Sequence, residues 1–420
     1  MTKTLPLFFL AIFFVIYYGS YAQSGKFIVQ NPSGVARIED PLVLSRATLE
    51  GLVSVPQDGK TAELYVDGQL LPSQLDDVNG DGKWDELAFL ATVNRNTNVE
   101  VKIKWVSVGE EKKVPKRTQV WFGVSENRDG KFQPVTSELR PETWTPQQQP
   151  PRYQMEGPGW ENDKVAFRNY FDSRNGIDIF GKTTSRLVLD SVDGSYLDYH
   201  HICPWGMDIL KVGPSLGAGA FALVDKGNLF PLQQTGSAFY RQISNGPVRS
   251  VFELIYEGWK VGDEPLNAKQ RISIWAGKYW YSNEVTITGF SGQRELAIGI
   301  VNLKNPNPAI YNTHNKKYLS LASHARQSEN DDFLGMGILF QSAVFSGYGE
   351  APKIQPWPQK DTVSHTFYGK IKIRSGEPAQ YQFFAAWEKT EARFGNARYF
   401  LDLIQEEADR REFPLIISKK

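Results

Sequence analysis

Polar and apolar residues alternate along many short stretches of this 420-residue chain. Clear examples are residues 62–66, 99–105, 249–256, 270–275 and 369–374. Such alternation places successive side chains on opposite faces of a strand, which is typical of a sheet with one buried face. The 36 glycines and 24 prolines fall mostly between these stretches, where turns are needed. The pattern therefore predicts an all-β protein.

One helical pattern stands out near the C-terminus. Asn396 is placed to cap a helix that runs up to Pro414. We expect this helix to cover a sheet. Its apolar positions are Phe400, Leu403, Ile404 and Ala408.

The N-terminus has the pattern of a signal peptide. An apolar run from Leu5 to Tyr18 follows the positive charge of Lys3, and it is shorter than the roughly 20 apolar residues that span a bilayer as a helix. Small residues then stand at the positions that a signal peptidase reads. We expect residues 1–22 to be removed on export to the periplasm, with a membrane anchor as the alternative. No later run is apolar for long enough to span a membrane, so an integral membrane protein is not expected.

The mature chain divides by composition. Residues 126–159 are rich in proline, glutamine and charged residues without periodicity, which indicates a connector or a long surface loop. We expect a smaller β module over residues 23–125. The remaining residues, 160–420, have the length of a large antiparallel β-sandwich that ends in the C-terminal helix.

Charge and composition narrow the classes of function. Lysine plus arginine and aspartate plus glutamate both total 47, so the chain has no net charge. A nucleic-acid partner, which requires a basic excess, is therefore not expected. Cys203 is the only cysteine, so no intramolecular disulfide can form. The aromatic fraction of 13% suits either sugar-stacking surfaces or ordinary packing.

The sharpest short motif lies between residues 77 and 86. Oxygen-bearing side chains at alternate positions, with a glycine at the turn, match the first half of an EF-hand calcium loop. The glutamate expected at the twelfth position falls on Ala88, so the closing ligand must come from elsewhere. The motif predicts either a structural calcium site or a polar turn that holds no ion. The candidate ligands are Asp77, Asn79, Asp81 and Asp85.

A second group of chemically active residues lies between Phe167 and Gly219. It is dense in Tyr, His, Lys, Arg and Asp, the residue types that acid–base chemistry on an anionic substrate requires. His200 and His201 are adjacent, so in a strand only one of them faces a given cleft. Each residue alone can equally be a surface residue or half of an ion pair. The glycines at the end of this segment lack the Gly-Lys-Ser/Thr of a phosphate loop, and no organic cofactor is expected.

Three stretches resemble an exported bacterial family that is classed as a domain of unknown function (four-eight-six-one) and found among polysaccharide-degradation genes. They are residues 74–87, 168–182 and 199–219, and residues 205–213 are the most specific part. The resemblance extends over nearly the whole mature chain. Among antiparallel sandwiches, a mutarotase-like supersandwich is the form that we consider for the main domain.

The resemblance also implies a reaction. A relative in an ulvan pathway is an oligosaccharide dehydratase, which removes water from a terminal uronic acid and leaves a 4,5-unsaturated sugar. This implies a carbon–oxygen lyase for an anionic oligosaccharide, with the key histidine at His200. The C5 proton is α to a carboxylate, so a cation must neutralise that carboxylate while a base and an acid act. The implied catalytic residues are Tyr199, His200, Asp208 and Lys211, and the implied substrate-binding residues are Arg168, Arg174, His201 and Trp205.

Other functions stay open at the level of sequence. A polysaccharide lyase performs the same elimination with a sugar as the leaving group. A glycoside hydrolase would use a pair of carboxyl groups among Asp172, Asp178 and Asp208. A non-catalytic carbohydrate-binding protein would use aromatic side chains such as Trp275 and Trp280. The sequence leaves the assignment of base and acid, the glycan and the oligomeric state undecided.

Overall fold

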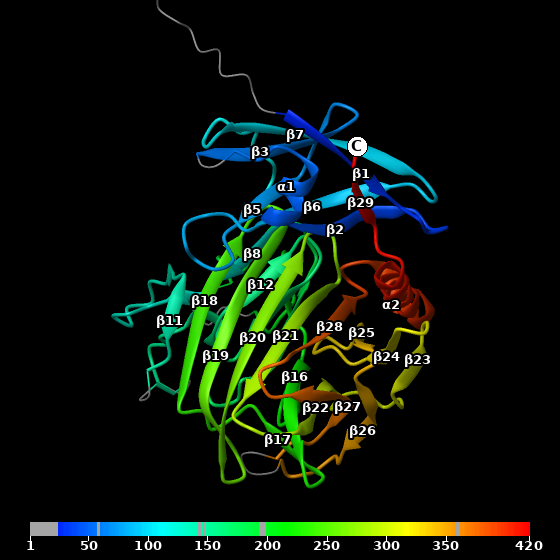
Figure 1. Ribbon diagram of the computed structural model, residues 1–420. Helices are drawn as coiled ribbons and strands as arrows, with labels where there is room; N and C mark the ends of the chain where they lie inside the picture. Colours follow the sequence, from blue (N-terminus) through cyan, green and yellow to red (C-terminus); the bar gives the residue numbers. More distant parts are fainter. Residues whose placement is uncertain (1–23, 57–58, 142–143, 146–147, 193–198, 358–361) are drawn as a thin grey trace, which may run out of the picture.

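The computed structural model describes residues 24–56, 59–141, 144–145, 148–192, 199–357 and 362–420 (Figure 1). The predicted signal peptide, residues 1–22, lies outside this part. Within it, no helix is long and apolar enough to cross a membrane. Antiparallel sheets make up most of the described chain, which confirms the all-β prediction.

The N-terminal module consists of two sheets around a core of their own. A five-stranded sheet has the order β29-β1-β7-β3-β4, and a three-stranded sheet has the order β2-β6-β5. The last strand of the chain pairs with the first, so this module also contains the C-terminus (Figure 1). Its elements are β1 (Ser24–Gln30), β2 (Arg37–Ser45), α1 (Arg46–Leu52), β3 (Lys60–Val66), β4 (Gln69–Leu71), β5 (Ser73–Asp76), β6 (Glu86–Val93), β7 (Asn98–Ser107) and β29 (Ile416–Lys419).

The body of the molecule is organised around a nine-stranded antiparallel sheet. Its order is β11-β18-β19-β20-β21-β28-β25-β24-β23. The first strand, β11, comes from the segment that was expected to be a connector. The strands are β11 (Ser137–Leu139), β18 (Ser237–Asn245), β19 (Arg249–Val261), β20 (Glu264–Trp275), β21 (Trp280–Thr288), β23 (Ile310–Thr313), β24 (Tyr318–Arg326), β25 (Phe333–Gln341) and β28 (Pro378–Trp387).

Two five-stranded sheets pack on one face of this large sheet. Their orders are β15-β14-β13-β12-β8 and β17-β16-β22-β27-β26, and a short β9-β10 pair accompanies them. The elements are β8 (Thr118–Trp121), β9 (Gly123–Val124), β10 (Gln133–Pro134), the 3-10 helix η1 (Gln154–Glu156), β12 (Gly159–Asn162), β13 (Ala166–Asn169), β14 (Ile177–Lys182), β15 (Gly206–Asp208), β16 (Ala218–Asp225), β17 (Asn228–Pro231), β22 (Gln293–Val301), β26 (Phe345–Ala351) and β27 (Thr366–Arg374).

The two faces of the nine-stranded sheet belong to different cores. On β21, Tyr281 and Val285 lie in the main core, which the two five-stranded sheets share through residues such as Phe167 and Ile298. The neighbouring Trp280 points to the opposite face and packs in a second core below the C-terminal helix. Alternation along the strands therefore separates an inner face from an outer face of the sheet.

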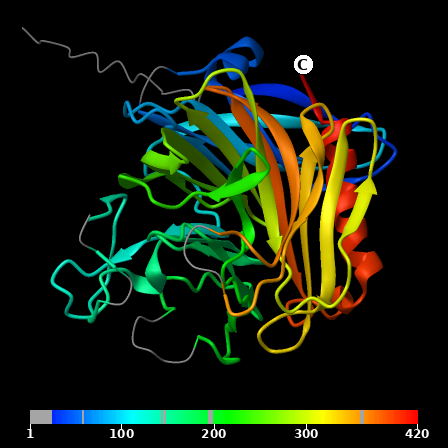
Figure 2. The same cartoon turned by 90° about the horizontal axis from the view of Figure 1, so that it is seen from below.

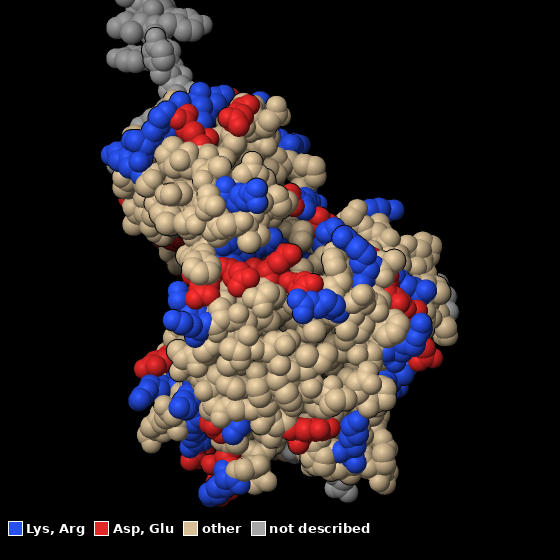
Figure 3. All heavy atoms as spheres, turned by 90° about the vertical axis from the view of Figure 1, so that its right-hand side faces the viewer, with Lys and Arg blue, Asp and Glu red and all other residues tan. Residues whose placement is uncertain are grey.

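The N-terminal module is fastened to the outer face of the body by polar contacts. The Arg249 guanidinium donates to Asp76 at 3.0 Å and to Glu86 at 2.7 Å. The side-chain oxygen of Gln74, Oε1, accepts hydrogen bonds from the backbone N–H groups of Val248 and Arg249. Charged side chains of both signs gather at the waist between module and body (Figure 3).

Helix α2 (Ala397–Glu412) confirms the predicted C-terminal helix. It follows the 3-10 helix η2 (Ala392–Gly395) and lies against β24 and β25 (Figure 2). The Asn396 side chain accepts the N–H of Arg398, as expected of an N-cap. Phe400, Ile404 and Ala408 are buried against the sheet. The apolar helix face that the sequence predicts is therefore the face that packs on the sheet.

Close packing of α2 on β25 depends on glycine. A Cβ atom at Gly335 would lie 2.6 Å from Cγ of Phe400. We expect Gly335→Ala to lower the free energy of unfolding by about 1–3 kcal/mol, because overpacking forces helix and strand apart. The matched control is Gly51→Ala in α1, where nothing lies within 4 Å of the new methyl group. An equal melting temperature for both variants in a thermal scan would contradict the packing argument.

Candidate functional site

Buried charged side chains line the outer face of the sheet β15-β14-β13-β12-β8. On β13, Phe167 points into the main core, whereas Arg168 faces a cavity of about 630 Å³. The strands are thus buried on both faces, and the outer face carries ionisable residues beside a small apolar cluster that includes Ala166 and Phe180. The ionisable and aromatic residues that line the cavity are Glu156, Arg168, Tyr170, Arg174, Tyr199, His200, Asp208, Lys211, Glu329 and Trp357.

Arg168 is the centre of this face. Its side chain is 3% exposed, and its Nη2 donates to Asp178 Oδ2 and to Asp208 Oδ2, both at 2.8 Å. The same nitrogen donates to the Tyr170 hydroxyl at 3.1 Å, and Nη1 donates to the Tyr199 hydroxyl at 3.2 Å. Each of these hydrogen bonds fixes a side chain from a different part of the fold, so one guanidinium organises the site.

Asp208 is a buried carboxyl group on this face whose pKa is strongly shifted. Burial raises the pKa of Asp208 well above its ordinary value; the negative charge of Asp178 adds to this, and Arg168 offsets only part. Asp178 also accepts the Tyr170 hydroxyl at 2.6 Å. Asp208 can therefore keep its proton at a pH at which an exposed aspartate is ionised.

The rings of Tyr199 and His200 are in contact at the cavity, with centroids 4.3 Å apart and planes tilted by 42°. Burial raises the pKa of Tyr199, so its hydroxyl is protonated at neutral pH. Because this hydroxyl accepts from Arg168, its own hydrogen is left for another acceptor. The His200 side chain is 66% exposed, and its Nδ1 lies 3.8 Å from Asp208 Oδ2. Partial desolvation and the charge of Arg168 lower the pKa of His200, which favours the neutral imidazole.

A turn ahead of β15 holds the Tyr199–His200 pair in place. Cys203 and Gly206 exchange backbone hydrogen bonds at 3.1 and 3.0 Å, and the Tyr199 carbonyl accepts the N–H of Asp208 at 2.7 Å. Gly206 has a φ of 134°, and a Cβ there would lie 1.8 Å from the Gly181 carbonyl oxygen. This position therefore requires glycine, which gives a structural reason for the Trp-Gly sequence.

Arg174 stands at the cavity wall with part of its charge accessible. It pairs with Asp172, donating from Nε at 2.9 and 3.0 Å, and it lies 3.3 Å from Glu156. Its guanidinium stacks over the Tyr170 ring at 4.0 Å, yet the side chain is 44% exposed. In contrast to Arg168, it can still meet an anion that enters the cavity.

The other predicted site residues are distributed unevenly. Lys211 lines the cavity and is exposed. His201 is exposed but does not line the cavity. Trp205 packs edge-on against Phe180, with ring centroids 5.9 Å apart, and lies outside the lining as well. The structure thus brings together Arg168, Arg174, Tyr199, His200, Asp208 and Lys211.

Three ionisable or aromatic lining residues lie outside the segments that the sequence singled out. Glu156 belongs to the segment that looked like a connector, and Glu329 and Trp357 lie far along the chain. Trp357 is 46% exposed, and its ring closes on Gly213, where a Cβ would lie 3.3 Å away. In the sequence, Trp357 could have been singled out only as an isolated tryptophan in a proline-rich stretch. No motif indicates that Glu156 or Glu329 belongs to a site.

The predicted calcium ligands lie in the loop between β5 and β6, on the N-terminal module. Asp77 accepts the backbone N–H groups of Gly80 and Gly82 at 2.7 and 2.8 Å. Asn79, Asp81 and Asp85 also accept backbone N–H groups of the loop. Within the described residues, no three His, Cys, Asp or Glu side chains gather closely enough to hold a metal ion. The oxygen chemistry still suits calcium, because an oxygen that accepts one N–H keeps a further lone pair.

Comparison with known proteins places the chain in a family. The family model described as "Domain of unknown function (DUF4861)" matches residues 29–417, so the chain belongs to this family. The "Uncharacterized protein P7" of Formosa agariphila is 25% identical over 280 residues, which are 62% of this chain and 66% of that protein.

Two solved structures from Enterococcus faecalis also align with the chain. An alpha-mannosidase matches with a TM-score of 0.43 and 10% identity, and a protein in the Glycosyl Hydrolase Family 38 with a TM-score of 0.41 and 11% identity. Each alignment covers 94% of this chain but only 46% and 47% of the respective structure. The chain therefore spans about half the length of these proteins.

The Arg168 network allows a stability test. Arg168→Met leaves Asp178 and Asp208 buried without their cation, which we expect to lower the free energy of unfolding by about 3–5 kcal/mol. The loss should be larger at pH 8 than at pH 5, because burial raises the pKa of Asp208 and the lower pH favours its neutral form. Urea unfolding at both pH values measures it.

The control for this test is Arg241→Met. Arg241 pairs with Glu253 at 2.7 Å, but its side chain is 39% exposed. The buried Glu253 keeps Arg271 at 2.8 Å when Arg241 is removed, so its charge stays paired and this variant should lose less stability than Arg168→Met at both pH values. Equal losses in the two variants would contradict the central role of Arg168.

Proposed function

We propose that this member of the DUF4861 family is a carbon–oxygen lyase. It would eliminate water from, or cleave beside, a uronic acid of an oligosaccharide and leave a 4,5-unsaturated uronate, with ulvan-type substrates favoured. The observation that carries the proposal is the contact of the Tyr199 and His200 rings at the cavity, with the Tyr199 hydroxyl hydrogen-bonded to Arg168. This pair offers a neutral base next to a protonated acid.

The cavity also offers cations for a uronate carboxylate. The donors of Arg168 are directed at Asp178, Asp208 and the two tyrosines, so it serves to position these groups. Arg174 and Lys211 are both exposed at the wall. We assign to them the neutralisation of the substrate carboxylate, which is needed because removal of the C5 proton moves charge into it.

The proposed reaction needs one base and one acid. His200 takes the C5 proton, the released electron pair forms the C4–C5 double bond, and the C4 oxygen leaves as its bond to carbon breaks. Tyr199 protonates that oxygen, which departs as water, or as a sugar alcohol if the substrate is cleaved. Arg168 stabilises the resulting tyrosinate through its hydrogen bond to the Tyr199 hydroxyl, and Asp208 Oδ2 lies 3.8 Å from Nδ1 of the imidazolium. Exchange with water restores both groups.

Activity itself is the first test. Incubation with a panel of uronate oligosaccharides should raise the ultraviolet absorbance of a conjugated uronate. A product lighter by one water means a dehydratase, and two shorter fragments mean a lyase. His200→Ala should lower kcat/KM about 10²–10⁴-fold. The control is His201→Ala, because His201 is the next residue but does not line the cavity, and this variant should keep kcat/KM near the wild-type value. An unaffected His200→Ala enzyme would exclude the proposed base.

The pH profile follows from the two pKa shifts. The pKa of His200 lies below the usual 6.5, so kcat/KM should rise with pH only on the acid side of 6.5 as the imidazole loses its proton. The pKa of Tyr199 lies above the usual 10, so the midpoint of the alkaline decline should lie above pH 10. Tyr199→Phe should remove the alkaline decline from the residual activity. An optimum centred near pH 5 would contradict these assignments.

A glycoside hydrolase is the second candidate, because Asp178 and Asp208 both accept from one nitrogen of Arg168 and the pKa of Asp208 is raised by burial. Asp178 does not line the cavity, however, so it lacks contact with a substrate there. Reducing sugar without ultraviolet absorbance would favour hydrolysis. Binding by calorimetry without turnover would favour a carbohydrate-binding protein.

We also propose that the chain is exported to the periplasm after removal of residues 1–22.

We further propose that the loop at Asp77–Asp85 binds a structural calcium ion. A calcium concentration a hundredfold above Kd should stabilise the protein by about 2.7 kcal/mol. Asp77→Asn should abolish that gain, whereas Asp263→Asn, in an exposed turn elsewhere, should keep it. Identical melting curves in calcium and in EDTA would leave the loop as a polar turn.

A further inference from the structure

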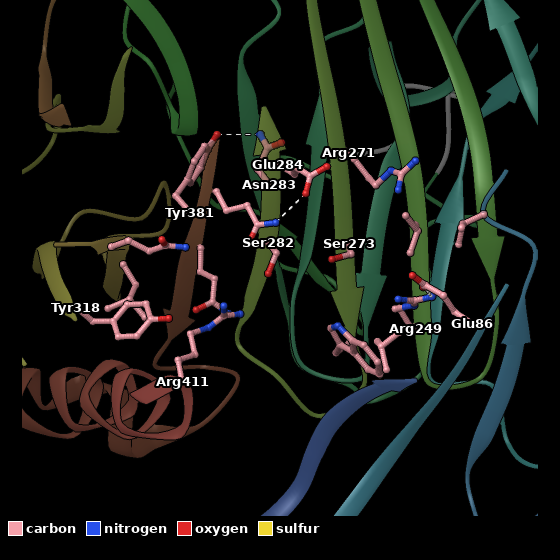
Figure 4. A pocket seen from close by; sticks show the side chains of 18 residues that line it. Glu86, Arg249, Arg271, Ser273, Ser282, Asn283, Glu284, Tyr318, Tyr381 and Arg411 are labelled. Atoms are coloured by element: carbon pink, nitrogen blue, oxygen red, sulfur yellow. Dashed lines mark hydrogen bonds and ion pairs between the residues drawn. The ribbon is translucent and has the colours of Figure 1, made fainter. Parts of the chain in front are cut away.

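A second hollow lies at the waist, on the outer face of the nine-stranded sheet (Figure 4). Two cavities of about 340 and 360 Å³ share the lining residues Trp275, Ser282, Tyr318 and Arg411. They therefore form one continuous hollow between the N-terminal module, the sheet and helix α2, which we call the waist groove. Each half is within the range of small-molecule sites, about 300–1,000 Å³.

The floor of the waist groove is made of small polar side chains. Ser273 and Ser282 lie at its centre, with Tyr318 and Arg411 on one side and Arg249 and Glu86 on the other (Figure 4). These residues alternate along their strands with residues of the main core, so the polar row belongs to the outward face of the sheet. The groove and the Arg168 cavity lie in different parts of the fold and share no lining residue.

The cations of the waist groove are already neutralised. Three of the arginines at its wall donate to carboxylates of the protein, and the fourth, Arg410, lies 3.9 Å from both Asp40 and Glu406. Each described arginine of the groove therefore faces a carboxylate, which disfavours an anionic ligand. In the Arg168 cavity, Arg174 is also paired, with Asp172, but the exposed Lys211 adds a further cation at the wall. The pairs are Arg249 with Glu86 at 2.7 Å, Arg271 with Glu253 at 2.8 Å, and Arg411 with Glu407 at 3.0 Å.

Two buried acceptor atoms at the groove lack a hydrogen-bond donor. Gln382 is 3% exposed and donates from Nε2 to Glu407 at 3.1 Å, but its Oε1 accepts no hydrogen bond from the described residues. Glu407 is 6% exposed, and its Oε2 likewise accepts none, with Arg410 only at 4.0 Å. Buried acceptors of this kind are rare in native proteins and call for a donor from water or a ligand. Hydroxyl groups are such donors.

We propose that the waist groove binds a neutral segment of an oligosaccharide. Sugar hydroxyls donate to Gln382 Oε1 and Glu407 Oε2 and exchange hydrogen bonds with the two serines, while the half-buried Tyr318 ring contacts the C–H face of a pyranose. The ligand is neutral because the arginines are paired. The choice of a sugar rests on the proposed function, in which the protein meets oligosaccharides at its other site; the groove would hold the chain beyond the uronate or a second chain.

The test is calorimetric titration of the mature protein with cellohexaose, xylohexaose and laminarihexaose as neutral probes. We expect at least one to bind with a Kd in the millimolar range or below. Ser282→Trp fills the groove at the point that both halves share, and it should weaken binding at least tenfold. Ser237→Trp is the matched control, because Ser237 is also half-buried on the nine-stranded sheet but does not line the groove.

The two proposals fail in different ways. His200→Ala should keep neutral-sugar binding, and Ser282→Trp should keep any elimination activity on a short uronate substrate. Binding that survives Ser282→Trp, or that His200→Ala removes, would assign the sugar to the cavity and overturn the groove proposal. Absence of binding by all three probes would also overturn it. Groove binding without elimination activity would reject only the proposed lyase.

Discussion

The buried guanidinium of Arg168 is the interaction on which the candidate site depends. It joins β13 to Asp178 of β14 and Asp208 of β15, and it reaches Tyr199 ahead of β15. A buried cation between two carboxylates is costly to desolvate, so the arrangement is stable only with its hydrogen bonds complete. The same requirement fixes the tyrosine hydroxyls in direction, which is what acid–base chemistry needs.

The hydrogen-bond donors of Arg168 are directed at side chains of the protein, so Arg168 and Arg174 differ in what they can bind. Arg168 is 3% exposed on its side chain and positions other groups, whereas Arg174 is 44% exposed and can meet a substrate. In the proposed function, Arg168, which the resemblance implies as a substrate ligand, is therefore assigned the positioning of other groups. Burial, which the residue type does not reveal, decides between the two roles.

The nine-stranded sheet separates two environments. Its inner face packs on both five-stranded sheets, one of which carries the cavity, and its outer face supports helix α2, the N-terminal module and the waist groove. The module is held there by Arg249 and Gln74, and by the return of β29 to β1. The N-terminal module, held in this position, forms one wall of the waist groove over the outer face of the nine-stranded sheet.

The sequence by itself determined the local structure. Alternating patterns gave the strands, and the spacing from Phe400 to Ala408 gave the face of α2 that the structure buries. The clustering of Arg168, Tyr199, His200 and Asp208 was visible because these residues are near in sequence. Only the tertiary structure decided that Trp205 packs away from the cavity and that Glu156, Glu329 and Trp357 enter it. Pairing between distant strands brings these side chains together, and that pairing depends on burial summed over whole sheets, which a local pattern does not encode.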